Sequence, residues 1–354
     1  MKIDRFVKML VTAGMIAMFT CGITAFADTV KVNASNLNFR TSASMNAEVI
    51  RTLPRGTVLE RTENLGEWSK VNVGGVTGYA ASRYLQEVTP SVSETVADTV
   101  YASEAWTVEM KPEYQYASNS KINSGLATFY NTNAQTPKGK VICVNAGHGT
   151  KGGSSVKTLC HPDGSPKVTS GTTAAGATTA VAVSSGMTFN DGTPESTVTL
   201  KMAKILRDKL LAEGYDVLMI RETDDVQLDN IARTVLANNL ADCHLALHWD
   251  STTSDKGCFY MSVPNHAGYR AMEPVASHWE SHNQLGDCLI EGLRAEGNKI
   301  FSSGAMEMDL TQTSYSTIPS VDIELGDKAS SHSKETLEKL SNGLVVGIGH
   351  FFNK

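Results

Sequence analysis

Three ionisable side chains lie where buried segments of the sequence end, and their types suit a metal ion. His148 follows the apolar run 141–145 and stands between two glycines in the stretch VICVNAGHGT. His248 ends the strand predicted in CHLALHWDS, and Glu324 closes a buried run in PSVDIELGD. A carboxylate at the end of a buried run is costly unless it is paired or bound to a cation. Imidazole and carboxylate groups are ligands of catalytic zinc, which keeps one position open for water.

A second carboxylate, Glu195, lies in the first turn of a predicted helix beside the expected sheet edge. Two imidazoles and this carboxylate would hold zinc. Glu324, left uncoordinated, would take a proton from the attacking water and pass it to a leaving nitrogen. The glycines around His148 would let the backbone approach the ion closely. The pattern alone leaves two other interpretations open, because a histidine at a strand end is often structural and a glutamate in a first helical turn interacts favourably with the helix dipole.

The elements that would position these side chains alternate between strands and helices from Lys140 onward. The segment 194–213 carries apolar residues at spacings of three and four, which indicates a helix. Strands are expected at 141–145, 215–220, 243–248 and 321–325, and further helices at 228–240, 273–296 and 333–352. This alternation predicts an α/β domain over residues 139–354, with a mostly parallel sheet flanked by helices. The carboxyl ends of its strands are the expected site.

A second histidine pair offers a rival metal site. His278 and His282 are four residues apart on one face of a predicted helix, in the stretch HWESH. Glu280 falls nearly opposite that face, unlike the base of the His-Glu-x-x-His motif, and we therefore interpret both histidines as solvated or packing residues. We also interpret the Cys160-His161 pair as structural.

The N-terminal part of the chain predicts a small all-β domain over residues 28–88, preceded by a signal peptide. Residues 1–27 combine a basic start, an apolar stretch and the small-x-small sequence Ala25-Phe26-Ala27, which is typical of a cleaved secretory signal. An N-terminal membrane anchor is the alternative interpretation. No other run approaches transmembrane length, so we expect a secreted protein without stable membrane insertion after cleavage.

Residues 30–88 consist of short alternating runs separated by polar or glycine-containing turns, which predicts a small β-barrel. Its aromatic residues Trp68, Tyr79 and Tyr84 could form the core or bind a ligand. Residues 89–138 are rich in Ser, Thr, Ala and Asn and indicate a linker. Within it, Tyr101 and Trp106 suggest that part of the segment packs against something.

Composition excludes one class of partner and leaves one question open. The formal net charge is −6 and becomes more negative without the basic first segment, so the chain has no general attraction for nucleic acid. Six cysteines are present, and five lie beyond the predicted signal. An odd number without a Cys-x-x-Cys motif permits one or two disulfides or none, with buried free thiols as the alternative.

Residues 140–354 resemble the zinc-dependent N-acetylmuramoyl-L-alanine amidases of the amidase-3 type. The resemblance rests on the order of VICVNAGHG, the Glu195 helix, GYDVLMIRETDD, IARTVLANNLADCHLALHWDS and PSVDIELGDKAS. It implies His148, Glu195 and His248 as zinc ligands and Glu324 as the catalytic residue. The implied reaction cleaves the amide between N-acetylmuramic acid and L-alanine in peptidoglycan. The resemblance also implies that Arg233 supports the site, and Asn145 stands where the family commonly has an aspartate.

Residues 28–88 resemble bacterial SH3-like domains through LNFR, the RGT turn, EWSKV and GYAASRYL. That resemblance implies binding to the cell wall or to its stem peptides, and hence a secreted protein associated with the wall.

The chain departs from the amidase pattern at four places. Besides Asn145, Trp249-Asp250-Ser251 and Gly326-Asp327-Lys328 replace the family's usual neighbours of His248 and Glu324, which is expected to reshape the groove. The segment between His148 and Glu195 is longer than the family norm and carries TSGTTAAGATTAVAVSSG, as expected for a flexible lid or a substrate-contacting loop. Its length leaves Glu213 and Glu222 as alternatives to Glu195. Two other functions stay open: a wall-binding protein with a degenerate enzyme domain, and a zinc peptidase that cuts the stem peptide.

Overall fold

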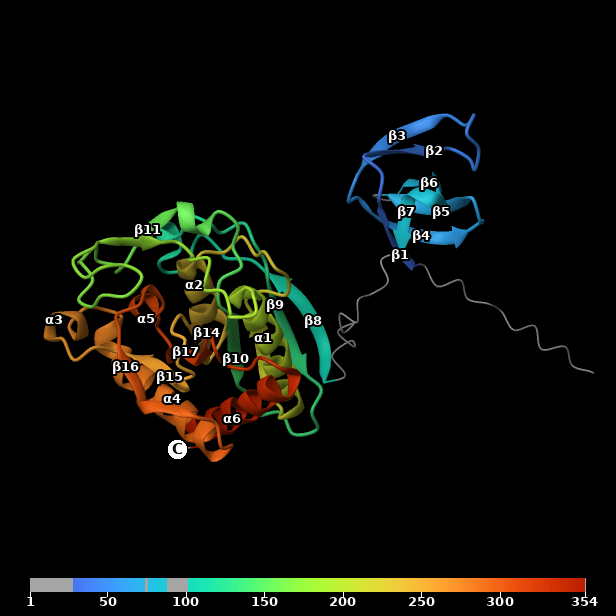
Figure 1. Cartoon of the computed structure of the whole chain (residues 1–354). Coiled ribbons are helices and arrows are strands. Elements are labelled where there is room, and N and C mark those ends of the chain that lie inside the picture. The colour runs from blue at the N-terminus through green and yellow to red at the C-terminus, as the bar shows by residue number, and fades with distance from the viewer. Residues whose placement is uncertain (1–27, 74–75, 88–100, 354) are drawn as a thin grey trace, which may run out of the picture. The chain divides into compact units, whose positions relative to one another are not determined.

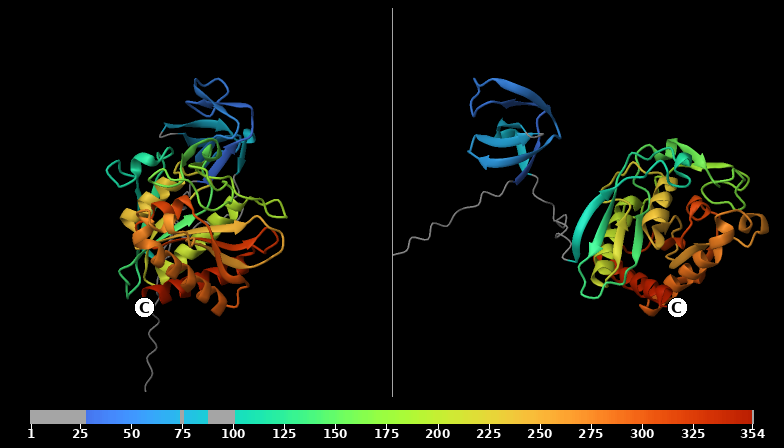
Figure 2. Two further views of the ribbon diagram at one scale, coloured as in Figure 1. Left: turned by 90° about the vertical axis from the view of Figure 1, so that its left-hand side faces the viewer. Right: turned by 180° about the vertical axis from the view of Figure 1, so that it is seen from behind.

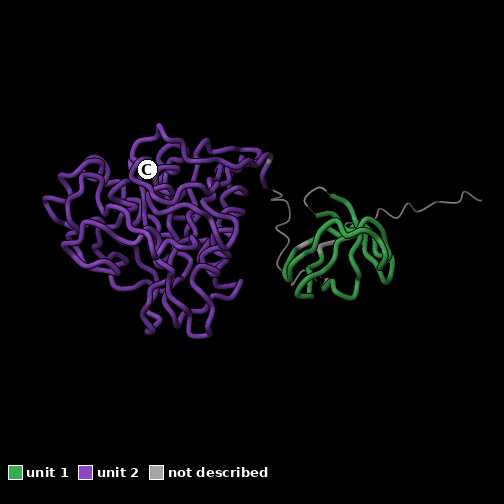
Figure 3. The backbone as a smooth tube through the Cα atoms, turned by 90° about the horizontal axis from the view of Figure 1, so that it is seen from above, with its two compact units in different colours: residues 1–95 green, residues 96–354 purple. Residues whose placement is uncertain are grey.

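The computed structural model describes residues 28–73, 76–87 and 101–353, and the chain separates into two compact units, residues 1–95 and 96–354 (Figure 3). The predicted signal peptide lies outside the described residues. Within the described ranges, no helix is both long and apolar enough to cross a membrane. The five cysteines in these ranges are all buried and free, so the thiol alternative holds for them.

The first unit is an antiparallel sheet that curls around its own apolar core (Figure 1). Alternation along β2, Asn36–Arg40, turns Leu37 and Phe39 inward, where they pack with Val30, Leu59 and Val71. The other strands are β1 Asp28–Val32, β3 Val49–Pro54, β4 Val58–Asn64, β5 Trp68–Val73, β6 Val76–Ala81 and β7 Leu85–Glu87, in the spatial order β3-β2-β6-β5-β4-β1-β7. The prediction of an all-β unit is confirmed. Its core is mainly aliphatic, and Tyr84 is 40% exposed beside the Arg83 guanidinium.

The second unit is built on an eight-stranded sheet in the order β16-β15-β17-β14-β10-β13-β9-β8. The strands are β8 Ala102–Val108, β9 Ala127–Thr132, β10 Val141–Ala146, β13 Asp216–Met219, β14 Cys243–Asp250, β15 Cys258–Ser262, β16 Ile300–Glu307 and β17 Ser320–Asp327. The central four, β17, β14, β10 and β13, are parallel, whereas β15 runs antiparallel to β17, and β9 runs antiparallel to both β13 and β8. The sheet is therefore mixed, and the expectation of a mostly parallel sheet describes only its centre.

The segment predicted as a linker over 89–138 contributes two of these strands. β8 pairs with β9, and β9 pairs with β13, so residues 101–138 belong to the second unit. Residues 121 and 122 donate their backbone N–H groups to the buried Asp229 carboxylate, at 2.6 and 2.9 Å, which fastens the chain between the strands to the start of a helix. The suggestion that Trp106 packs is confirmed, because its ring stacks on Phe129 with centroids 4.8 Å apart.

Helices cover both faces of the second sheet (Figures 1 and 2). Three of them, α1 Glu195–Ala212, α4 Val275–Ala295 and α6 Lys334–Phe352, pack on one face around an extended apolar core. The helix α2, Asn230–Leu240, covers the opposite face and contacts the short α5, Thr311–Tyr315. A short helix, α3 Ala267–Arg270, precedes α4, and a two-stranded ribbon of β11 Lys157–Leu159 and β12 Thr179–Val181 lies in the long loop before α1.

This arrangement brings the ends of three strands together. β10, β14 and β17 are parallel neighbours, so their carboxyl ends lie at one edge of the sheet. Alternation along β14 turns Leu245 and Leu247 into the core beneath α1, α4 and α6 and leaves His248 on the other face.

Candidate metal centre

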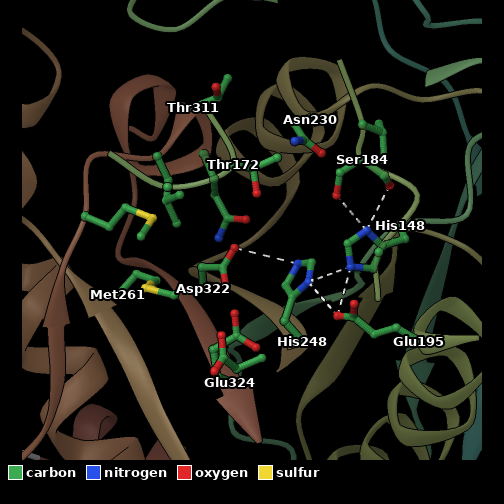
Figure 4. Close-up of a pocket in the computed structure, with 18 of the residues that line it drawn as sticks. His148, Thr172, Ser184, Glu195, Asn230, His248, Met261, Thr311, Asp322 and Glu324 are labelled. Atoms are coloured by element: carbon green, nitrogen blue, oxygen red, sulfur yellow. Dashed lines mark hydrogen bonds and ion pairs between the residues drawn. The ribbon is translucent and has the colours of Figure 1, made fainter. Parts of the chain in front are cut away.

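Three side chains from distant parts of the chain converge at this edge (Figure 4). His148 Nε2 lies 2.8 Å from Glu195 Oε1 and 3.0 Å from His248 Nδ1. His248 Nδ1 lies 3.1 Å from the same Glu195 oxygen. His148 follows β10, Glu195 opens α1 and His248 lies near the end of β14. The structure therefore brings together the three residues that the sequence suggested as ligands.

The three atoms fit a metal ion by geometry and by chemistry. A tetrahedral zinc with bonds of about 2.0–2.1 Å separates neighbouring ligand atoms by about 3.3 Å, close to the 2.8–3.1 Å seen here. In their ligand forms all three atoms are electron-pair donors, and three such atoms repel one another unless a cation lies between them. No other group of three or more His, Cys, Asp or Glu residues in the described ranges has this arrangement.

The backbone around His148 is unusual for a residue with a side chain. His148 has a φ of 64°, in the left-handed region that is uncommon for residues other than glycine. A Cβ at Gly147 would overlap the His248 ring, and one at Gly186 would lie 2.8 Å from His148 Cδ2. Glycine at both positions therefore allows the close approach, which the sequence suggested for Gly147 but not for Gly186.

Two buried arginines hold this turn in place. Arg221 donates to the carbonyls of Ala146 and Gly147 at 3.1 and 3.0 Å. Arg233 donates to the carbonyl of Ala146 at 3.2 Å and to that of His148 at 2.6 Å. Three consecutive carbonyls thus accept from guanidinium groups, which fixes the strained backbone. Burial lowers the pKa of Arg233 to about 9 and that of Arg221 to about 10.

Asn145 acts through one of these arginines. Its Oδ1 accepts a hydrogen bond from Arg233 Nη1 at 3.0 Å, and its amide nitrogen lies 3.2 Å from the ring of the buried His244. The residue contacts none of the three converging side chains in the described structure, and its connection to the turn runs through Arg233.

The long loop before α1 completes the surroundings of His148 and Glu195. His148 Nδ1 lies 2.9 Å from the Ser184 carbonyl, and donation to it leaves the Nε2 lone pair free to face the centre. Glu195 accepts from the backbone N–H groups of Met187 at 2.8 Å and Trp249 at 3.0 Å. Burial alone would raise the pKa of Glu195, but hydrogen bonds and charge from His148 and His248 hold it well below its ordinary value.

Two further carboxylates lie beside His248. Asp322 Oδ2 is 3.6 Å from His248 Nε2, and Glu324 lies opposite His248 in the register of β14 and β17. Burial disfavours the charged form of His248, but the negative charges of Asp322 and Glu195 outweigh the effect of burial and raise the pKa of His248 to about 10. Glu324 is 9% exposed, and no described residue donates a hydrogen bond to its Oε2. Burial raises the pKa of Glu324 well above its ordinary value.

These groups line a cleft of about 700 Å³, within the range of small-ligand sites. Its walls include Met261, Met306 and Met308 from the region of β15 and β16, and Thr172 and Thr173 from the long loop. Figure 4 shows His148, Glu195 and His248 on one side of this space and Met261 on the other. The cleft thus combines a polar, charged wall with an apolar one.

The long loop is held by the buried Asp309 rather than free. Asp309 accepts hydrogen bonds from Lys167 at 2.9 Å and from the backbone N–H groups of Val168 and Thr169 at 2.7 and 3.1 Å. His161 Nε2 lies 3.1 Å from the same carboxylate. These contacts fix residues 161–169, which precede most of the stretch TSGTTAAGATTAVAVSSG, and the expectation that this stretch is flexible stays a prediction.

The alternatives to Glu195 and the rival histidine pair lie outside the cluster of three converging side chains in the described residues. Glu222 binds Arg207 and Tyr130 at 3.0 and 2.9 Å, and Glu213 lies at the far end of α1. His278 contacts the Pro274 carbonyl at 2.8 Å, and His282 accepts from the backbone N–H of Ser320 at 3.0 Å. Burial lowers the pKa of His282 to about 3.

Sequence reasoning missed three residues of the site: Asp322, Arg221 and Ser184. Asp322 had a signal, because it precedes Glu324 by two residues on the same strand and must share its face. Arg221 and Ser184 had none, since Arg221 donates to backbone carbonyls of the turn and Ser184 contacts His148 through its own carbonyl, and both contacts depend on tertiary folding.

Comparisons with known proteins match both units. Residues 142–348 match the N-acetylmuramoyl-L-alanine amidase family, and residues 35–86 match the bacterial SH3 domain family. YrvJ of Bacillus subtilis, named as a candidate N-acetylmuramoyl-L-alanine amidase, is 27% identical over 218 residues, which cover 54% of this chain and 41% of that relative. The chain therefore spans less than half the length of this relative.

Solved structures of N-acetylmuramyl-L-alanine amidases are also similar. The apo form of Ami1 from Mycobacterium abscessus is 20% identical with a TM-score of 0.49, covering 60% of this chain and 99% of that one. Ami1 from Mycobacterium smegmatis is 20% identical with a TM-score of 0.49, covering 61% and 97%. Because the family match covers more than half of the sequence, the chain belongs to the N-acetylmuramoyl-L-alanine amidase family.

Proposed function

We propose that this chain hydrolyses the amide bond between N-acetylmuramic acid and L-alanine in bacterial peptidoglycan. The observation that carries the proposal is the convergence of His148 Nε2, His248 Nδ1 and Glu195 Oε1 within 3.1 Å, in a cleft that also holds Glu324. Membership of the amidase family supports the choice of bond.

His148, Glu195 and His248 would hold zinc, the ion that suits two imidazoles and one carboxylate and retains an open position. When bound, zinc would supply Lewis acidity, which makes an amide carbonyl more electrophilic and a water more acidic near neutral pH. The Ser184 carbonyl would keep the His148 ring in the required tautomer.

Glu324 would move the proton. Its Oε2 has no hydrogen-bond partner among the described residues and borders the cleft, so it is free to accept the proton of a water that attacks the amide carbon. As the new carbon–oxygen bond forms and the carbon–nitrogen bond breaks, Glu324 would give that proton to the leaving nitrogen. The products are the muramic acid carboxylate and a free L-alanine amine.

The first unit would bind the wall. Its match to the bacterial SH3 domain family supports a role in holding the enzyme near peptidoglycan, and hence a location outside the cell or in the wall. The signal-peptide interpretation of residues 1–27 agrees with that location.

The test is product analysis with Glu324→Gln, a change that keeps size and removes the base. We expect wild-type protein to release new L-alanine amino termini from purified peptidoglycan and the variant to release them about 10²–10⁴-fold more slowly. Glu291→Gln, on an exposed position of α4, is the matched control and should retain full activity. Wild-type rates in Glu324→Gln would overturn the role of Glu324, and a different new amino terminus would identify a stem peptidase instead.

A further inference from the structure

We infer that Asp322 is a positioning residue that orients His248 for metal binding, an inference that rests on the proposed zinc site. The family match does not by itself assign a function to this position.

The His248 ring bridges the ligand cluster and Asp322. Its Nδ1 faces His148 and Glu195 at 3.0 and 3.1 Å, while its Nε2 faces Asp322 Oδ2 at 3.6 Å (Figure 4). The distance to Asp322 is that of an ion pair rather than of a direct hydrogen bond. One ring nitrogen is thus directed to the metal centre and the other to a carboxylate.

The fold gives the Asp322 carboxylate this direction. β17 is the parallel neighbour of β14, with Asp322 opposite Ala246 and Glu324 opposite His248. Because alternate residues of a strand share a face, Asp322 and Glu324 both project from the side that carries His248.

Asp322 has one ionic partner within the described residues, and that partner is His248. Its side chain is only 17% exposed, and a carboxylate removed from water is costly unless a partner compensates. An isolated acid would therefore be a poor choice at this position for stability alone. A carboxylate next to a ligand histidine holds the proton on the outer nitrogen and makes the inner nitrogen a better ligand.

The two acids in the cleft consequently have different tasks. Asp322 is paired to His248, whereas Glu324 Oε2 has no described hydrogen-bond partner and is free for proton transfer. The two histidines also differ, because His148 contacts a neutral carbonyl and His248 contacts a charged group. Loss of Asp322 should therefore weaken metal binding, and loss of Glu324 should weaken turnover.

The experiment measures zinc affinity directly, by competition with a chromophoric chelator, in the full chain. Outer partners of metal ligands typically contribute about 10–100-fold in affinity. We expect Asp322→Leu to bind zinc about 10–100-fold more weakly than wild type. Asp322→Asn, which keeps a side-chain oxygen facing Nε2 but removes the charge, should lose less, and this partial rescue would not follow from a purely structural role. Thermal unfolding of the zinc-free proteins checks that both variants are folded.

Two controls separate this inference from the proposed function. Asp250→Asn removes one charge from the same cleft at a residue paired with Lys256 rather than with His248, and should change zinc affinity less than twofold. Glu324→Gln should bind zinc as wild type does. Unchanged zinc affinity in both Asp322 variants overturns the inference while the zinc site stands. A wild-type protein that does not bind zinc overturns the proposed function, and the inference with it.

Discussion

Removal of the Asp309 carboxylate should loosen the long loop that contributes to the metal centre. Asp309 is completely buried between β16 and α5 and accepts from Lys167, Val168 and Thr169, with His161 beside it. The same loop continues to Ser184, whose carbonyl contacts His148. An Asp309→Ala variant would leave Lys167, only 7% exposed, without its carboxylate partner.

The expected loss in free energy of unfolding follows from the burial of the Asp309–Lys167 ion pair. Removal of one partner from a buried ion pair typically destabilises a protein by about 3–5 kcal/mol, because the remaining charge is left uncompensated. Local opening of the loop would limit this cost by returning Lys167 to water. We therefore expect a lower free energy of unfolding together with faster amide exchange and faster proteolysis in residues 157–187. Zinc affinity should fall as well, because His148 loses its fixed partner.

The chain provides a control with the same chemistry at the surface. Asp191 and His332 are 3.0 Å apart, nearly the same as the 3.1 Å between Asp309 and His161, but the Asp191 side chain is 56% exposed. An ion pair with a solvated partner contributes little, because water competes for the exposed Asp191 carboxylate. Asp191→Ala should therefore leave stability, exchange and zinc affinity unchanged. Urea unfolding and hydrogen exchange on both variants make the comparison.

The pH dependence gives a second readout of the same group. Burial would raise the pKa of Asp309, but His161, Thr169 and their neighbours hold it well below its ordinary value. Its stabilising contribution is therefore complete above the ordinary aspartate pKa of about 3.9 and is lost as the pH falls through the lower folded value. The difference in free energy of unfolding between wild type and Asp309→Ala should therefore become smaller as the pH falls below about 3.9. A difference below about 1 kcal/mol near neutral pH, with the loop still protected from exchange, would refute this account of the loop.

Three further predictions concern the metal, the turn and the first unit. Chelation of zinc should lower the unfolding temperature reversibly, since an ion present at 100 times its dissociation constant stabilises the folded state by about 2.7 kcal/mol. A calorimetric scan with and without chelator measures the unfolding temperature, and an unchanged value would contradict the metal site. Arg233→Lys should cost about 2–4 kcal/mol in urea unfolding, because an ammonium cannot reach the acceptors now shared by the planar guanidinium, which include Ala146, His148 and Asn145. Phe39→Ala should cost about 3–5 kcal/mol in the first unit and abolish its transition while leaving that of the second unit in place, since Phe39 is fully buried in a small core.

The sequence could predict the residues of the site whose positions follow from strand periodicity and motif order. His248 lies two residues before the end of β14, as the apolar run before it indicated. Glu324 does not close its buried run as expected, because β17 continues through the buried residues Leu325, Gly326 and Asp327. The carboxyl ends of neighbouring parallel strands lie at the same edge of a sheet, so the fold class alone predicts that these residues lie close together. The helix at Glu195 was predicted within one residue of its observed start, from its apolar spacing.

The remaining features depended on contacts that local patterns do not encode. The segment 101–138 is polar in composition, so the strands β8 and β9 were not recognised, although Trp106 signalled packing. The replacement of a smaller residue by Trp249 suggested a reshaped groove. In the structure its side chain is only 2% exposed and lies near Phe189, with ring centroids 6.0 Å apart. A bulky residue beside a ligand histidine can thus support a site from beneath.

The long loop belongs to the metal centre as much as the ligand side chains do. The Ser184 carbonyl lies 2.9 Å from His148 Nδ1, Gly186 permits the approach of His148 and Glu195, and the backbone N–H of Met187 donates to the Glu195 carboxylate. These contacts use carbonyls, amides and a missing side chain, so they would leave no chemical signature in a motif. The same loop is anchored through Asp309, whose chain neighbours Met308 and Leu310 line the cleft, so one segment contacts both the metal centre and the part of the chain that forms another wall of the cleft. We therefore expect a variant of this chain that lacks Ser184, Gly186 and Met187 but keeps His148, Glu195 and His248 to bind zinc more weakly than wild type, because these groups orient the ligands.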